Sequence, residues 1–364
     1  MNLAFSEDQR FIQDQANNFL QAQCTPLHVR EILESDQTFH QALWQQMVDL
    51  GWPALSIPET YGGLGLGFLE LCLIAEELGK ALAPVPFLSS VVLATEAIKA
   101  SDDEKLKHTW LSALASGESI GCVCLNNTSS LSVNDGQANG TLLPVFDGGV
   151  ADFIIFVNTD AEGSQQLFLA DLSQTAVKVT NLDSMDPSKN IATIELKQAI
   201  VTPIAFSASV ETVINKLYNT AAVITAFEQF GGAEKAMNTG IEYTKNRYAF
   251  GRQVASFQAI KHKFADMFVA LELAKSNAYY AAWALSSDAE ELELAASTAR
   301  VSGSEAYYDI SKENIEVHGG MGFTWEFDCH LYYRRAQYLA AVIGTQPVWQ
   351  DKLVDALIAH GIAA

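Results

Sequence analysis

The sequence has 364 residues, 49% of them hydrophobic and 18% charged, so it is long enough for two or three domains with buried cores. Its formal net charge of −21 argues against nucleic acids and anionic membranes as partners, because like charges repel. No apolar run approaches the roughly 20 residues needed to cross a bilayer. The first residues, MNLAFSEDQRFIQDQ, have neither a basic head nor an apolar signal core, which predicts a cytoplasmic protein without membrane insertion.

The first part of the chain, residues 1–118, is predicted to be helical. Ser6 followed by Gln9 is a capping-box pattern, which favours a helix that begins directly after Ser6. A glycine-rich loop precedes the segment LGFLELCLIAEELGKALA, which is apolar almost all round. Such a segment is typical of a helix in the interior of a bundle.

The composition changes near residue 119. Short runs such as SIGCVCL, ADFIIFV and QQLFLADL have the composition of β-strands, and Gly, Asn, Asp and Ser separate them. Cys122 and Cys124 alternate along one such run, so both should point to one face and be buried as reduced thiols. The spacing of the five cysteines matches no zinc pattern, and we expect no metal.

The last part of the chain is predicted to be helical again. Long helices are expected at about Ser209–Asn246, Phe257–Leu285 and Asp288–His318, with a shorter one near 329–342. Long helices with short connections indicate a four-helix bundle. The expected fold is therefore mostly α within the α+β class. An N-terminal helical domain (1–118) is followed by a small β-barrel or sandwich (119–206) and a C-terminal bundle (207–364).

The order of the helical and β parts and the length of the chain resemble one protein family, and several local motifs resemble the same family. They are IPETYGGLGLGFLELCLIAEELGKALAPVP, LDSMDPSKNIATIEL, QFGGAEKAMNTGIEYTKNRYAFGRQVASFQAIKHKFADM and NIEVHGGMGFTWEFDCHLYYRRA. The third, with Arg-x-x-Phe-Gly followed by Phe-Gln, is the most specific. Together they are similar to the acyl-CoA dehydrogenase family, and the last resembles its steroid-type, heterotetrameric members in particular.

The resemblance implies an FAD-dependent oxidation of an acyl-CoA thioester. In the family a carboxylate removes the α proton while the β hydride passes to the flavin, and the protein supplies position and electrostatics. The resemblance also implies a homo- or heterotetramer in which neighbouring subunits share FAD sites. An electron-transfer flavoprotein is a further expected partner.

The resemblance assigns cofactor contacts to six residues. Arg247 matches the arginine that meets the FAD pyrophosphate of a neighbouring subunit, although a surface arginine that ends a helix would have the same local sequence. The glycines match positions where a neighbour's FAD approaches the backbone, and they would also suit a helix C-cap. The six expected cofactor-binding residues are Arg247, Phe250, Gln258, Gly319, Gly320 and Thr345.

The expected catalytic carboxylate is missing from the sequence. Gly344 and Thr345 keep the family register, which places Ile343 where most members have their catalytic glutamate. The second position used in the family lies early in a long helix, and here residues 213–227 contain no carboxylate. Glu228 lies on the same helix, about two turns beyond that second position, and is the candidate base. The alternative is that Glu228 makes a structural polar contact.

The flavin-ring motifs of the family are also altered. Where the family has a Thr-Glu-Pro-x-Ala-Gly-Ser-Asp-like loop this chain has CLNNTSSLSVNDG, and LPVFDGGVADFIIF lacks the usual tryptophan. Three interpretations stay open: an active dehydrogenase with an unusual base, a non-catalytic or half-site subunit of a heterotetramer, or a flavin enzyme that needs no such base. The first two differ in whether this chain removes a proton.

Overall fold

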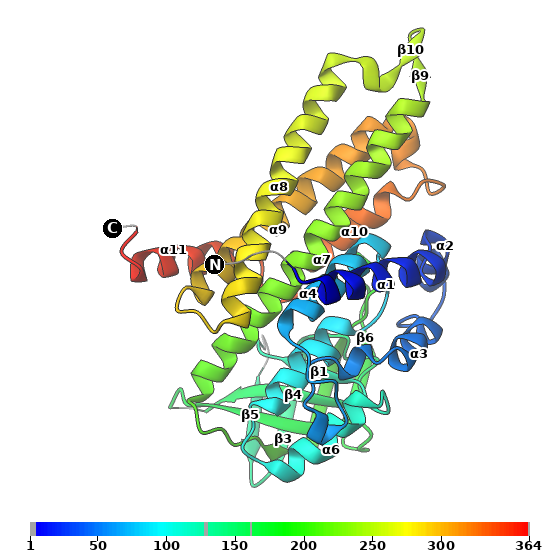
Figure 1. Ribbon diagram of the computed structural model, residues 1–364. Coiled ribbons are helices and arrows are strands. Elements are labelled where there is room, and N and C mark those ends of the chain that lie inside the picture. The colour runs from blue at the N-terminus through cyan, green and yellow to red at the C-terminus, as the bar shows by residue number, and fades with distance from the viewer. Residues whose placement is uncertain (1–4, 127–129, 161, 363–364) are drawn as a thin grey trace. The chain divides into compact units, whose positions relative to one another are not determined.

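A computed structural model describes residues 5–126, 130–160 and 162–362. Its N-terminal part is helical, as predicted (Figure 1). The predicted capping box is confirmed, because the Gln9 backbone N–H donates to Ser6 Oγ at 3.2 Å and the Ser6 N–H donates to Gln9 Oε1 at 3.0 Å. The elements are α1 (Glu7–Gln23), α2 (Pro26–Leu33), α3 (Gln41–Asp49), η1 (Trp52–Ala54), η2 (Glu59–Tyr61), α4 (Phe68–Ala81), the π-helix η3 (Phe87–Ala94), α5 (Thr95–Lys99) and α6 (Glu104–Ala115).

Two four-stranded sheets follow. The first has the order β1 (Gly121–Cys124), β4 (Phe153–Thr159), β5 (Gln165–Asp171), β8 (Thr202–Pro203). The second has the order β2 (Leu131–Asn134), β3 (Gln137–Phe146), β7 (Ile191–Ile200), β6 (Val177–Asn181). The pair β1–β4 is parallel and the other pairs are antiparallel. Neither sheet closes into a barrel among the strands that the structure describes.

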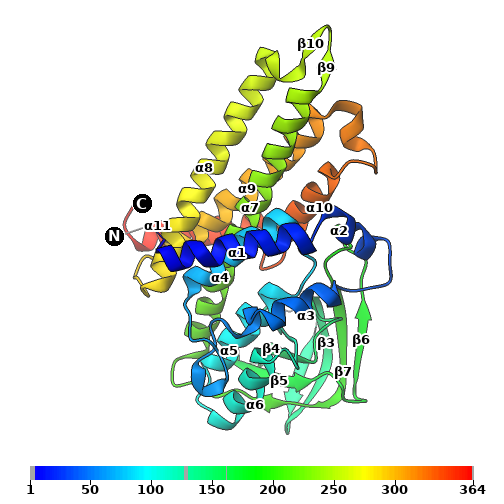
Figure 2. The ribbon, with the colours of Figure 1, turned by 45° about the vertical axis from the view of Figure 1, so that its right-hand side comes forward.

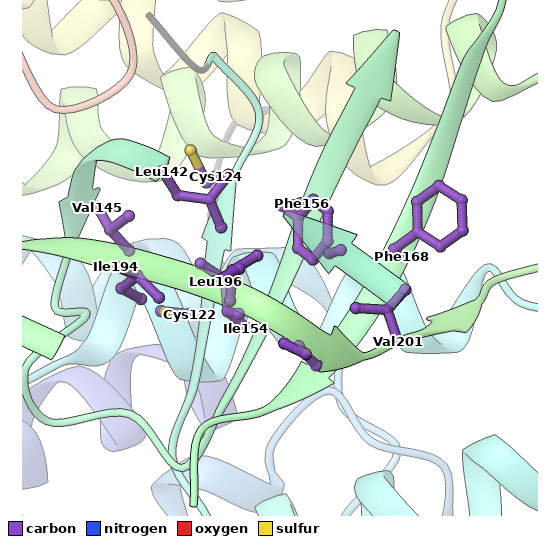
Figure 3. Close-up of a cluster of buried hydrophobic side chains, with 13 residues drawn as sticks. Cys122, Cys124, Leu142, Val145, Ile154, Phe156, Phe168, Ile194, Leu196 and Val201 are labelled. Atoms are coloured by element: carbon purple, nitrogen blue, oxygen red, sulfur yellow. The ribbon is translucent and has the colours of Figure 1, made fainter. Parts of the chain in front are cut away.

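Buried side chains from both sheets pack into one hydrophobic cluster. Figure 3 shows Ile154 and Phe156 of β4 among residues of β3 and β7, such as Leu142 and Ile194. Cys122 and Cys124 belong to this cluster as free, buried thiols, as their alternation predicts. The middle of the chain is thus a sandwich, since each sheet alone would leave its apolar face in water.

The C-terminal helices form the second helical part. The four expected helices are present as α7 (Val210–Asn246), α8 (Gln258–Ser286), α9 (Leu292–Val317) and α10 (Cys329–Leu339). A further helix, α11 (Gln346–Ala359), was not predicted, and it begins with Pro347 in its first turn. Short elements connect them: β9 (Tyr248–Ala249), β10 (Arg252–Gln253), η4 (Val254–Ser256) and η5 (Gly319–Phe323).

The chain divides into two compact units. The helical unit comprises the described residues of Met1–Val29, Phe68–Ala83 and Ala222–Ala364, and the sheet-containing unit comprises Arg30–Gly67 and Pro84–Ala221. The three-domain division expected from the sequence stays a prediction. Of the helices in the described ranges, none has both the length and the apolar character to span a membrane.

Candidate functional site

A short hairpin between α7 and α8 carries the most specific motif of the sequence. β9 and β10 pair with Ala249 opposite Arg252, so Phe250 and Gly251 form a two-residue turn. Both have positive φ, +55° and +79°, as a type I′ turn requires. Phe250 is therefore 94% exposed rather than part of a core. Figures 1 and 2 both show this hairpin projecting beyond the ends of the two helices.

The segment that forms the hairpin and its flanks is basic in sequence. Residues 243–263 contain five Lys or Arg residues and no Asp or Glu, in a chain with 43 acidic and 22 basic residues. The backbone fixes Arg247, because its N–H donates to Tyr243 O at 2.9 Å and its carbonyl accepts from the Val254 N–H at 2.8 Å, while the side chain is exposed. The Arg252 guanidinium lies 3.9 Å from the centre of the Phe257 ring. Exposed guanidinium groups beside an aromatic side chain can bind a phosphate group and a flat ring.

Gly319 and Gly320 lie at the same end of the helical unit. The rings of Tyr243 on α7 and His318 at the end of α9 stack with centroids 4.1 Å apart. Lys263 on α8 forms ion pairs with Glu313 and Glu316 of α9, the second at 3.2 Å. The end of α7, the start of α8 and the end of α9 are therefore neighbours, and η5 continues from them.

The two glycines leave space around their backbone. A Cβ atom added at either would meet no other atom within 4 Å, and Gly319 has a φ of +62° that favours glycine. Gln258, the first residue of α8, is exposed beside the hairpin. Five of the six predicted cofactor residues thus gather at one open end with exposed guanidinium groups, and such an end suits the diphosphate and adenine of a dinucleotide.

Thr345 does not belong to this group. It is the N-cap residue of α11, which lies away from the hairpin in both ribbon views (Figures 1 and 2). Ile343, two residues earlier, is only 7% exposed. Its carbonyl accepts a hydrogen bond from Nε1 of the buried Trp349 at 3.1 Å. A buried hydrocarbon side chain therefore stands at the position where the sequence predicts the loss of the base, and Trp349 of α11 holds its backbone.

Glu228, the candidate base, forms a buried ion pair. Its Oε1 lies 3.3 Å from Nη1 of Arg335, whose side chain is 1% exposed. Arg335 also donates to the carbonyl oxygens of Leu82 at 3.0 Å and Ala83 at 3.4 Å, directly after α4. A Cβ at Gly79 would lie 2.0 Å from the Glu228 carbonyl, so α4 and α7 cross in close contact here. Glu228 is thus part of a junction between three helices.

Arg335 is a residue of the junction that no sequence motif predicts. The signal was present, since Leu331, Tyr332, Arg335 and Leu339 follow helical spacing and all four are buried on one face of α10. An arginine within such a stripe predicts a buried acidic partner. The sequence could not indicate which carboxylate, because Glu228 lies 107 residues away. The altered loop of the β-domain includes residues 127–129, which lie outside the described residues.

Comparison with known proteins decides the family. The model of the acyl-CoA dehydrogenase N-terminal domain matches residues 6–118, and that of the C-terminal domain matches residues 211–357. The chain belongs to the acyl-CoA dehydrogenase family. This match confirms the resemblance found in the sequence. The members of this family are FAD-dependent oxidoreductases.

Relatives within the family include steroid-type members. The chain is 29% identical over 338 residues to acyl-CoA dehydrogenase IpdE2 of Mycobacterium tuberculosis, covering 93% of both proteins. The ChsE4–ChsE5 complex of the same organism aligns with a TM-score of 0.90 at 26% identity, over 99% of both chains. A steroid acyl-CoA dehydrogenase, Tcur3481–Tcur3483, shares the fold with a TM-score of 0.88 at 22% identity, over 98% of this chain and 99% of that one.

Proposed function

We propose that this chain is the partner subunit of a heterotetrameric, FAD-dependent acyl-CoA dehydrogenase. In this role it helps to bind the FAD of a neighbouring subunit and does not itself remove the substrate proton. The observation that carries the proposal is the buried Glu228–Arg335 pair, together with Ile343 at the usual position of the base. The hairpin end, by contrast, keeps the residues that would face a neighbour's cofactor.

The hairpin residues divide the binding of the cofactor among them. Arg247 would form charge-assisted hydrogen bonds with the pyrophosphate, which in an acidic protein needs a local cation. The exposed ring of Phe250 would cover the adenine, and the open backbone at Gly319 and Gly320 would allow close approach. FAD, when bound, supplies the acceptor for the substrate hydride. These residues of the chain then contribute binding and orientation only.

Glu228 is a poor base for a structural reason. If it took a proton it would lose its charge, and Arg335 would be left as a buried cation without its counter-charge. An unpaired buried charge costs several kcal/mol, about 3–5 when one partner of such a pair is removed. The ion pair therefore opposes proton transfer to Glu228. Its role in this proposal is to hold α4, α7 and α10 together.

The substrate class follows from the relatives. One structural neighbour is a steroid acyl-CoA dehydrogenase, and another is a complex of two different chains, ChsE4 and ChsE5. These likenesses support a bulky acyl-CoA, such as one with a steroid side chain, as the substrate of the assembled enzyme. They also support a heteromer over a homotetramer, in which every subunit would have Ile343 at the base position.

A second candidate function is a self-contained dehydrogenase with Glu228 as the base. It is favoured by one observation: Nη1 of Arg335 binds Oε1 of Glu228 at 3.3 Å, so a proton would go to the second carboxylate oxygen, Oε2. That oxygen would have to reach the α carbon of the substrate. The chain would then desaturate an acyl-CoA without a second type of subunit.

The deciding experiment counts flavin per chain in the purified protein and follows its visible spectrum during anaerobic addition of acyl-CoAs. We expect a chain that is colourless alone and that gains flavin and activity when mixed with a second dehydrogenase subunit, encoded nearby, with a glutamate at the position of Ile343. One flavin per chain that bleaches with an acyl-CoA, without any partner, would overturn the proposal and support the self-contained enzyme.

A further inference from the structure

A cavity of about 350 Å³ lies within the helical unit, apart from the residues discussed above. Residues of α1, α4, α7 and α10 line it, together with the turn between α1 and α2. Its volume is at the lower end of the range for small-molecule pockets, roughly 300–1,000 Å³. None of the predicted cofactor residues, nor Glu228 or Ile343, contributes to its wall.

Part of the wall is apolar and uncharged. Leu20, Cys24 and Tyr332 line it, and each is at most 3% exposed. Burial raises the pKa of the Cys24 thiol to about 12, so this group stays neutral. The Tyr332 hydroxyl donates to the Lys80 carbonyl at 3.2 Å, which leaves the ring as the surface offered to a ligand. An apolar molecular body could displace water here at little cost.

The charged groups at the wall are not equivalent. Glu77 accepts hydrogen bonds from Gln13 at 3.0 Å, from Asn17 at 2.9 Å and from Lys80 at 2.8 Å, so its charge is compensated. Lys80 in turn forms ion pairs with three carboxylates, those of Glu76, Glu77 and Glu234. These groups have little capacity left for a charged ligand.

Lys235 differs from this compensated network. It lines the same cavity from α7, its side chain is exposed, and it has no ion-pair partner within residues 5–126, 130–160 and 162–362. Its neighbour Glu234 pairs with Lys80 and, at 3.9 Å, with Lys275. The Asp328 carboxylate, at the start of α10, also lines the cavity and has interactions of its own. The cavity therefore combines an apolar interior wall with the exposed ammonium group of Lys235, which is the one lysine of its wall without a carboxylate partner among the described residues.

We propose that this cavity is a second ligand site, which takes a small molecule with an apolar body and a single anionic group. The apolar body would pack against Leu20, Cys24 and Tyr332, and the anion would lie beside Lys235. A carboxylate or a sulfonate satisfies this description. The site is independent of the FAD-binding role, because it shares no residue with the hairpin end.

The test is a fluorescence titration of the full-length chain with 1-anilinonaphthalene-8-sulfonate, an aromatic molecule with one sulfonate. We expect one saturable site per chain and a roughly tenfold higher Kd for Lys235→Met, as expected when one charge-assisted contact is lost. Competition by decanoate and by cholate distinguishes a linear-chain carboxylate from a steroid carboxylate as the natural type of ligand.

Two substitutions fill the cavity, and a third variant is a matched control for Lys235→Met. Leu20→Trp fills it from the interior, and Thr239→Trp fills it from its half-buried rim on α7 should the first variant fail to fold. Either should abolish the saturable signal. Lys312→Met removes an exposed lysine of α9 that does not line the cavity and should leave the Kd unchanged. Unchanged binding in Lys235→Met and in a folded cavity-filling variant would overturn the proposal, as would the absence of a saturable site.

Discussion

The hairpin end and the Glu228–Arg335 junction belong to the same helical unit. They differ in whether their charged side chains are exposed or buried. At the hairpin end, the side chains of Arg247 and Phe250 are exposed. Backbone hydrogen bonds hold Arg247, and the Phe250 ring has an edge contact with the Phe257 ring. At the junction, the charged groups are buried and bind each other and the ends of helices. The exposed side chains of the first region can bind a ligand, whereas the charged groups of the second already bind other groups within the fold.

This difference fits the proposal that the chain keeps half of a shared site. A residue that serves a neighbour's cofactor must stay exposed in the isolated chain, because its ligand comes from outside. Under the same proposal, the position of Ile343 has no such requirement and can be filled with hydrocarbon. Four variants can break or sharpen this comparison.

The largest expected effect comes from Arg335→Met. This change leaves Glu228 buried without a counter-charge and should lower the free energy of unfolding by about 3–5 kcal/mol, measured by urea denaturation. Adding Glu228→Gln to this variant should recover much of the loss. Lys178→Met is the control, since it breaks an exposed pair with Glu195 and should cost about 1 kcal/mol or less. A similarly small loss for Arg335→Met would show that the junction is not structural.

Arg247→Ala should act on cofactor binding and leave the fold intact. In the assembled enzyme we expect the Kd for FAD to rise about 10- to 100-fold, as a charge-assisted hydrogen bond contributes roughly 1.5–3 kcal/mol. The free energy of unfolding should change by less than about 0.5 kcal/mol, because the side chain is exposed. Arg10→Ala, at an exposed position on α1, is the matched control and should bind FAD normally. Equal FAD affinity in both variants would remove Arg247 from the cofactor site.

Glu228→Gln should change stability more than turnover. We expect the assembled enzyme to keep its kcat within about twofold, while the free energy of unfolding falls by roughly 1–3 kcal/mol because Arg335 loses its counter-charge. The kcat is measured below the unfolding transition, with any acyl-CoA that bleaches the flavin. A loss of turnover of a hundredfold or more, with flavin still bound, would identify Glu228 as the base.

The smallest expected effect is a pH dependence at His318. Burial lowers the pKa of His318 below its usual 6.5, against a smaller opposite effect of the hydrogen bond between Nδ1 and the Asn314 carbonyl. As the pH falls below about 6.5, the imidazole of His318 takes up a proton in the unfolded chain before it does so in the folded chain. The free energy of unfolding therefore falls as the pH falls. His318→Gln should therefore flatten the acid side of the stability profile. His262→Gln, at an exposed position on α8, should leave the profile as it is, and identical slopes for both variants would contradict the assignment.

Much of the fold was predictable because its signals are local. The capping box at Ser6, the alternation of Cys122 and Cys124 and the four long C-terminal helices follow from patterns within a few turns or strands. The helix α11 was missed because its apolar positions form no clear stripe, and only Trp349 and Ala356 are buried on it. The choice of a sandwich over a barrel depends on how the strands pair, which composition does not reveal.

The sequence by itself determined the family, the segment that forms the basic hairpin and the absence of a carboxylate at position 343. These features are contiguous, so spacing alone is enough to recognise them. Only the tertiary structure decided that Glu228 is paired with Arg335, that η5 lies at the hairpin end and that Lys235 faces a cavity without an ion-pair partner among the described residues. Each of these depends on which helices pack together, and residues far apart in the chain set that packing through burial and charge.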